Sequence, residues 1–146
     1  MRVGPTLKAL RDKYPDQLRV AIKQHPLPFH KQAKLAARAV LAAHEQGKFW
    51  EYQDRLLVPG AHLERDGLIA TAGELGLDVA HFTAAIDSDR FDAQIDAETK
   101  EAMAIGANGT PATFVNGRYV RGAQPLASFD QIVREALAEA EQKAGK

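Results

Sequence analysis

Two short β-forming runs near the C-terminus of this chain are joined by Asn116 and Gly117. The two runs are Ala112–Val115 and Arg118–Val120. Asn-Gly between such runs is the strongest short-range hairpin signal, because both residues tolerate the positive φ angles of a two-residue turn. The sequence therefore predicts an antiparallel β-hairpin near the C-terminus, and the fold of the whole chain must include it.

Most of the remaining chain has helical periodicity. A first helix is predicted over residues 2–14, with Pro5 in its first turn, where the missing N–H costs little. An all-α block follows over about residues 29–105, with helices predicted at 31–46, 48–57, 66–75, 78–87 and 90–105. Asp78 and Ser128 are predicted N-caps, the latter opening a last helix whose charged tail over 139–146 is expected to fray.

One further strand is predicted over residues 17–24. Leu18, Val20 and Ile22 alternate there with charged or small residues, which is the period of a strand, and two prolines follow. The resulting order is α, β, a helical block, β, β, α, without an internal repeat or a linker. We therefore expect an α/β fold in a single domain, residues 1–146, with the helical block as an insertion.

The composition excludes several classes of function. The 146 residues include no cysteine, so the chain's own residues provide no disulfide, cysteine-ligated metal site or thiolate nucleophile. Lysine and arginine number 19, as do aspartate and glutamate, which argues against a nucleic-acid partner. The longest apolar run, Leu35–Ala43, is far shorter than the ~20 residues that span a bilayer. We expect no membrane insertion and no signal peptide in this chain.

Polar and aromatic residues show no catalytic or metal-binding pattern. The five histidines lack the spacing of a zinc site, and the acidic residues of Asp87–Asp96 are out of register with a calcium loop. The glycines form no phosphate loop, and neither serine lies in a nucleophile elbow. Phe49, Trp50 and Tyr52 are expected to pack in the core of the helical block. We assign no metal, no cofactor and no catalytic residue.

Three stretches of the sequence carry a resemblance to a known family. Residues 109–118 read GTPATFVNGR and are followed by GAQP and a terminal helix. Together with the proline-rich segment 20–29 and QGKFWE at 46–51, they resemble the DsbA-like thiol:disulfide oxidoreductases over essentially the whole chain. The resemblance implies a thioredoxin fold with a helical insertion, oxidation or isomerisation of protein disulfides, and a location that is typically periplasmic or extracytoplasmic.

The chain departs from this family at the redox centre. Family members carry Cys-x-x-Cys at the end of a central strand, just before the helix that here begins near Arg2, and this sequence has neither. Without a thiolate the polypeptide itself cannot perform thiol–disulfide exchange. The resemblance places the absent strand between residues 17–24 and Ala112–Val115, which leaves two unpaired edges. We expect these strands either to pair with each other or to form a homodimer through their edges.

The same resemblance assigns substrate binding to Gly109, Thr110 and Pro111, with the Thr110–Pro111 peptide bond in cis. A backbone edge beside this loop can hydrogen-bond extended protein or peptide substrates. Three accounts remain open. The chain is part of a longer active oxidoreductase, or a non-catalytic peptide-binding or chaperone-like module, or a protein with other chemistry such as glutathione-dependent isomerisation, for which no nucleophile or acid–base pair is found.

Overall fold

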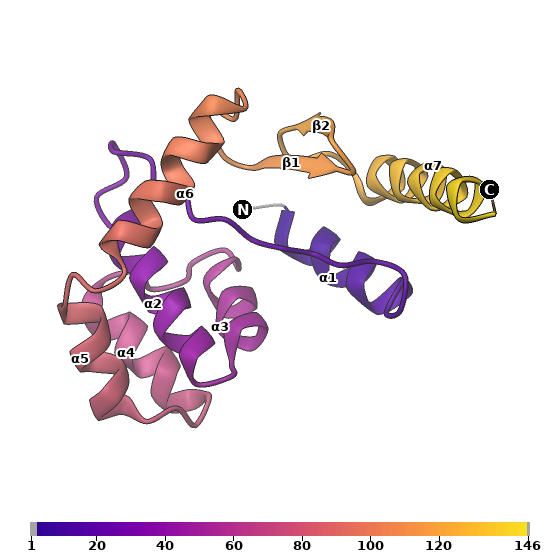
Figure 1. Cartoon of the computed structure of the whole chain (residues 1–146). Coiled ribbons are helices and arrows are strands. Elements are labelled where there is room, and N and C mark those ends of the chain that lie inside the picture. Colours follow the sequence, from indigo (N-terminus) through magenta and orange to yellow (C-terminus); the bar gives the residue numbers. More distant parts are fainter. Residues whose placement is uncertain (1–2, 146) are drawn as a thin grey trace. The chain divides into compact units, whose positions relative to one another are not determined.

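The computed structural model describes residues 3–145, within which it contains seven helices and one two-stranded sheet (Figure 1). The elements are α1 (Val3–Lys13), α2 (Ala33–Glu45), α3 (Phe49–Leu56), α4 (Arg65–Glu74), α5 (Val79–Asp87), α6 (Asp92–Ala104), β1 (Ala112–Val115), β2 (Arg118–Arg121) and α7 (Leu126–Ala144). The predicted helices and the hairpin are confirmed, with ends that differ by a few residues. The predicted start of the first helix at Arg2 lies outside the described residues.

The described residues form two compact units. The helical unit comprises residues 22–108, and the hairpin unit combines residues 3–21 with residues 109–145. The helical unit contains α2 to α6 and corresponds to the predicted insertion, extended by a few residues at each end. That the whole chain is a single domain stays a prediction.

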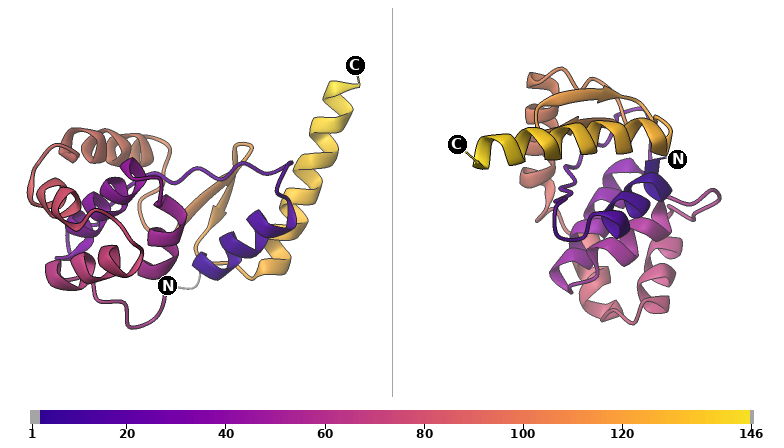
Figure 2. Two further views of the ribbon diagram at one scale, coloured as in Figure 1. Left: turned by 90° about the horizontal axis from the view of Figure 1, so that it is seen from below. Right: turned by 90° about the vertical axis from the view of Figure 1, so that its right-hand side faces the viewer.

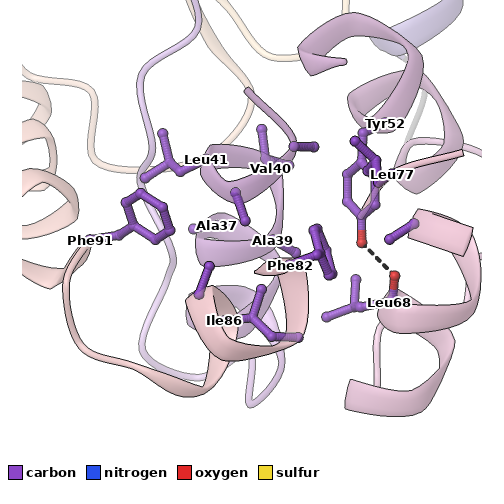
Figure 3. Close-up of a cluster of buried hydrophobic side chains, with 14 of the residues drawn as sticks. Ala37, Ala39, Val40, Leu41, Tyr52, Leu68, Leu77, Phe82, Ile86 and Phe91 are labelled. Carbon is purple, nitrogen blue, oxygen red and sulfur yellow. Dashed lines mark hydrogen bonds between the residues drawn. The ribbon is translucent and has the colours of Figure 1, made fainter. Parts of the chain in front are cut away.

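The core of the helical unit is built around the alanine-rich α2. Ala39, Ala42 and Ala43 are fully buried, and their small side chains let α3, α4 and α5 approach closely. Large side chains from the surrounding helices pack against these alanines. Those that are completely buried are Tyr52, Phe82, Leu68, Ile86 and Ile95. The Tyr52 hydroxyl donates a hydrogen bond to the Leu68 carbonyl at 2.9 Å, so its polar end is satisfied within the core (Figure 3).

Side-chain positions in the helical unit confirm one prediction fully and another for two of its three residues. The expected packing in the core is confirmed for Tyr52, which is buried there, and for Phe49, which packs against it. Trp50 is half-buried and is not one of the core residues; its ring meets the Phe49 ring edge to face at 4.9 Å. Asp78 caps α5, because its Oδ1 accepts a hydrogen bond from the backbone N–H of His81 at 2.9 Å. The apolar pattern and the cap are both local signals, and the cap forms as expected.

The hairpin unit packs β1 and β2 with α1 and α7, two helices that lie side by side (Figures 1 and 2). Its buried core consists of Leu10, Tyr14, Val120, Phe129 and Val133. Asn116 and Gly117 have φ angles of 47° and 84°, which are the positive values of a type I′ turn. The turn pairs Val115 with Arg118 and sets the register of the hairpin.

The strand predicted over residues 17–24 is wrong. This segment has no regular secondary structure, and the only sheet among the described residues is the pair β1 and β2. An alternating pattern suits a strand, but a strand also needs a ladder partner for its N–H and C=O groups. Here the chain first turns over residues 15–17, where the Leu18 N–H bonds the Tyr14 carbonyl at 3.0 Å. The expected pairing of this segment with β1 is therefore also wrong.

Two expectations for the last helix are corrected. Ser128 is not the N-cap, because α7 already begins at Leu126 after the extended Pro125, whose carbonyl accepts hydrogen bonds from Ser128 and Phe129. The charged tail remains helical to Ala144. Arg118 of β2 forms ion pairs with Glu135 and Glu139, near the start of the turns that were expected to fray.

Candidate functional site

The loop of Gly109, Thr110 and Pro111 leads directly into β1. Thr110 is exposed, and Gly109 and Pro111 are half-buried. A Cβ atom placed on Gly109 would have no heavy atom within 4 Å, so the space beside this residue is open. The Thr110–Pro111 peptide bond is cis, as predicted. Backbone groups of Gly109 and Thr110 have no hydrogen-bond partner among residues 3–145, and this leaves them free to bind a ligand.

The register of the hairpin determines which backbone groups of β1 are free. In a two-residue hairpin the residues flanking the turn form a hydrogen-bonded pair, and hydrogen-bonded and non-hydrogen-bonded pairs then alternate. Val115 and Thr113 therefore use their N–H and C=O groups to bind β2, whereas those of Ala112 and Phe114 point away from it. We call these four outward groups the outer edge of β1. No residue in the described part of the chain pairs with them.

The two faces of the hairpin differ in chemistry. Val115 and Val120 lie on the inner face, which packs on the core of the hairpin unit. Phe114, Tyr119 and Arg121 lie on the outer face, where the first two remain 37% and 43% exposed. Their rings stack with centroids 4.9 Å apart and an interplanar angle of 22°. Sequence reasoning missed this exposed aromatic pair, although the Asn-Gly register would have placed the two rings opposite each other.

Asp130 of α7 joins the two helices that support the hairpin. Its carboxylate accepts hydrogen bonds from the Tyr14 hydroxyl and from Lys13 Nζ, both at 2.7 Å, and Arg134 Nε lies 3.3 Å away. The hydrogen bond from Lys13, followed by that from Tyr14, holds the pKa of Asp130 below its ordinary value. This arrangement binds α1 to α7 and has no adjacent nucleophile, so we assign it a structural role.

The described residues contain neither a metal-binding cluster nor a membrane-spanning helix. Within residues 3–145 no three His, Asp or Glu side chains lie close enough together to hold a metal ion. No helix in that range is long and apolar enough to cross a bilayer. The candidate site consists of the free backbone groups of Gly109 and Thr110 and of the outer edge of β1.

Comparison with solved structures finds two proteins of similar fold. A thioredoxin-like oxidoreductase from Silicibacter pomeroyi DSS-3 superposes with a TM-score of 0.82 and 27% identity, over 92% of this chain and 77% of that one. The compact conformation of Proteus mirabilis ScsC gives a TM-score of 0.76 over 95% of this chain and 78% of that one. At 22% identity, the second likeness shows the fold alone.

Curated sequences give a different kind of relative. The chain is 39% identical over 134 residues to a protein named Na(+)/H(+) antiporter NhaA from Herminiimonas arsenicoxydans, covering 92% of this chain and 20% of that protein. It is 33% identical over 140 residues to Na(+)/H(+) antiporter NhaA 3 from Salinispora tropica, covering 94% and 22%. The chain thus spans about a fifth of the length of these relatives.

The family assignment rests on most of the chain. A family model described as a DSBA-like thioredoxin domain matches residues 6–134. The predicted thioredoxin-like α/β fold with a helical insertion is confirmed by this match together with the structural neighbours. The chain therefore belongs to the DSBA-like thioredoxin domain family.

Proposed function

We propose that this chain is a polypeptide-binding member of the DSBA-like family that performs no thiol–disulfide exchange with its own residues. Exchange requires a thiolate that attacks a disulfide sulfur and a second thiol that resolves the mixed disulfide. The sequence contains no cysteine, so neither group is available within it. The chain contains the loop of Gly109, Thr110 and Pro111, and we expect substrates of the family to bind at this loop.

The observation that carries this proposal is the free backbone of the loop before β1. Gly109 and Thr110 have no hydrogen-bond partner for their N–H and C=O groups among residues 3–145, and the space beside Gly109 is open. An extended polypeptide binds such a backbone by main-chain hydrogen bonds, which depend little on its sequence. We expect a ligand that is unfolded and contacts Gly109, Thr110 and Pro111.

Binding can be tested with a permanently unfolded polypeptide, reduced and carboxymethylated α-lactalbumin. We expect saturable binding by the wild type in isothermal titration calorimetry. Gly109→Trp places a large side chain in the open space beside the loop and should weaken binding about tenfold, or about 1.4 kcal/mol. Ala138→Trp adds the same bulk at an exposed position of α7 and should leave the affinity unchanged. Absence of saturable binding, or equal weakening by both variants, would contradict the proposal.

The absence of thiol chemistry needs a separate measurement. In an insulin reduction assay with dithiothreitol, we expect this chain to give the rate of the buffer alone. A cysteine-containing member of the family provides the positive control. A rate above that of the buffer, in a protein preparation free of other thiol enzymes, would refute this part of the proposal.

We do not extend ion transport to this chain. The relatives named as antiporters match it over about a fifth of their own length. We propose that the part they have in common with it is the DSBA-like domain, and that antiport belongs to the remainder of those proteins.

A further inference from the structure

We infer that Asn108 is a site of spontaneous chemical modification, where the side-chain amide leaves as ammonia and aspartate or isoaspartate is formed. Both asparagines of the chain, Asn108 and Asn116, are followed by glycine. This reaction is least hindered in the dipeptide Asn-Gly, because glycine has no side chain beside the attacking nitrogen. Only the first of the two positions has a backbone that is free to adopt the reactive geometry. This reactivity is separate from the proposed function and does not depend on it.

The reaction uses groups of residues 108 and 109 and one water molecule. The main-chain nitrogen of Gly109 loses its proton and bonds to Cγ of Asn108. The bond from Cγ to Nδ2 then breaks and ammonia leaves with that proton, so that a cyclic succinimide remains. Water opens the ring at one of two carbonyl carbons: cleavage at Cγ gives aspartate, and cleavage at the Asn108 main-chain carbonyl gives isoaspartate. No electron is transferred, because one water enters and one ammonia leaves.

The groups that react at Asn108 are accessible and unrestrained. Asn108 is exposed and lies in the irregular stretch between α6 and β1 (Figure 1). Among residues 3–145, neither its side chain nor the N–H of Gly109 has a hydrogen-bond partner. The Asn108 N–H bonds the Gly106 carbonyl at 3.0 Å, which leaves rotation about the following Cα–C bond of Asn108 free. A Cβ on Gly109 would meet no heavy atom within 4 Å, so there is room for the ring to close.

The same dipeptide at Asn116 is held by the hairpin. Asn116 and Gly117 are both exposed, so access to solvent does not distinguish this position from the first. Val115 and Arg118 on either side form a hydrogen-bonded pair, which fixes the peptide plane between Asn116 and Gly117. The ring can close only if that plane turns to bring the Gly117 nitrogen to Cγ, so the ladder bonds must open first. We therefore expect Asn116 to react only through the small population of open hairpin.

The decisive experiment follows both positions in one sample of the full chain. The protein is incubated at mildly alkaline pH, with and without concentrated urea, and peptides from digested samples are separated and identified by mass spectrometry. In the folded protein we expect ammonia loss at Asn108 to be about tenfold faster or more than at Asn116, because two ladder bonds must open at the second position. In urea the two rates should lie within about threefold of each other, mainly because Asn116 reacts faster there. Both aspartate and isoaspartate should appear at position 108.

Three results would overturn the inference. A rate at Asn116 equal to that at Asn108 in the folded protein would show that the hairpin gives no protection. Absence of reaction at Asn108 in the folded protein would show that the stretch before β1 does not reach the reactive geometry. Aspartate without isoaspartate at position 108 would show direct hydrolysis of the side-chain amide without a ring.

Two variants check the chemical route. Asn108→Gln lengthens the side chain by one carbon, which disfavours ring closure, and should abolish the product at position 108 while the rate at Asn116 stays unchanged. Gly109→Ala places a methyl group beside the attacking nitrogen and should slow the reaction at Asn108 about tenfold or more. Gly109 does not have a positive φ and its Cβ would meet no heavy atom within 4 Å, so this variant should fold. An unchanged rate at position 108 in either variant would contradict the ring route.

Discussion

Two glycines of α4 provide a matched test of how tightly the helical unit is packed. Gly67 and Gly73 both have helical backbones, so replacing either by alanine reduces the entropy of the unfolded chain equally. In an open helical position the change stabilises a protein by about 0.5–1 kcal/mol. A Cβ on Gly73 would meet only Val79 Cγ2, at 3.6 Å, which is an ordinary van der Waals contact. We therefore expect Gly73→Ala to stabilise the protein by about that amount.

Gly67 is in a different position because the preceding segment crosses it closely. A Cβ there would lie 2.4 Å from His62 Cβ, 2.8 Å from the His62 carbonyl oxygen and 2.9 Å from Glu64 Oε1. Carbon atoms in contact are separated by about 3.5–4.0 Å, so residues 62–64 would have to move by about 1 Å or more. Overpacking of this kind costs about 1–3 kcal/mol, which outweighs the gain in helix propensity. We expect Gly67→Ala to be destabilised by about 1–2 kcal/mol.

Urea denaturation followed by far-ultraviolet circular dichroism measures both variants against the wild type. The two substitutions are chemically identical and lie in one helix, so their difference isolates the close approach at Gly67. The expected difference is about 1.5–3 kcal/mol. If Gly67→Ala is as stable as Gly73→Ala, residues 62–64 move aside without a loss of stability, and the predicted overpacking at Gly67 is wrong.

Three further predictions concern single side chains. Tyr52→Phe removes a buried hydroxyl that bonds a backbone carbonyl and should lower the free energy of unfolding by about 1–2 kcal/mol in urea, whereas Tyr119→Phe, on the exposed face, should change it little. The pKa of Asp130 in the folded protein lies below its ordinary value of 3.8, so its ionised form stabilises the folded protein at pH values above 3.8. This contribution is lost as the pH falls below 3.8 and through the pKa of the folded protein. Thermal melts of the wild type should therefore lose more stability than those of Asp130→Asn as the pH is lowered from about 5 to 3. Arg118→Gln removes both ion pairs with α7 and should speed amide exchange over Glu139–Ala144, and unchanged exchange would show that the ion pairs do not hold this end.

Features that depend on neighbouring residues could be predicted well. The cap at Asp78 forms as expected because a carboxylate at that position reaches the third N–H of the helix without any tertiary contact. The same reasoning predicted the turn at Asn116 and Gly117, whose positive φ angles are intrinsic to those residues. The sequence also predicted the family, and with it the loop at residues 109–111 as the candidate site.

Features that depend on distant residues could not be predicted in this way. Asp130 receives hydrogen bonds from Lys13 and Tyr14, which are 117 and 116 residues away in the chain, so no local pattern indicates this contact. The tail that was expected to fray is helical to Ala144, and the ion pairs of Arg118 with Glu135 and Glu139 come from another element of the fold, so the tail's own sequence does not indicate them.

The helices, the hairpin, the family and the absence of any thiol in this chain can be read from residue identities and short spacings. That residues 17–24 form no strand, although they alternate as a strand does, is apparent only in the folded chain. The folded chain also leaves the outward groups of Ala112 and Phe114 unpaired beside an exposed aromatic pair. The physical reason is the same in both cases: a strand exists only with a hydrogen-bonding partner, and whether one is in place is a property of the folded chain and not of the segment.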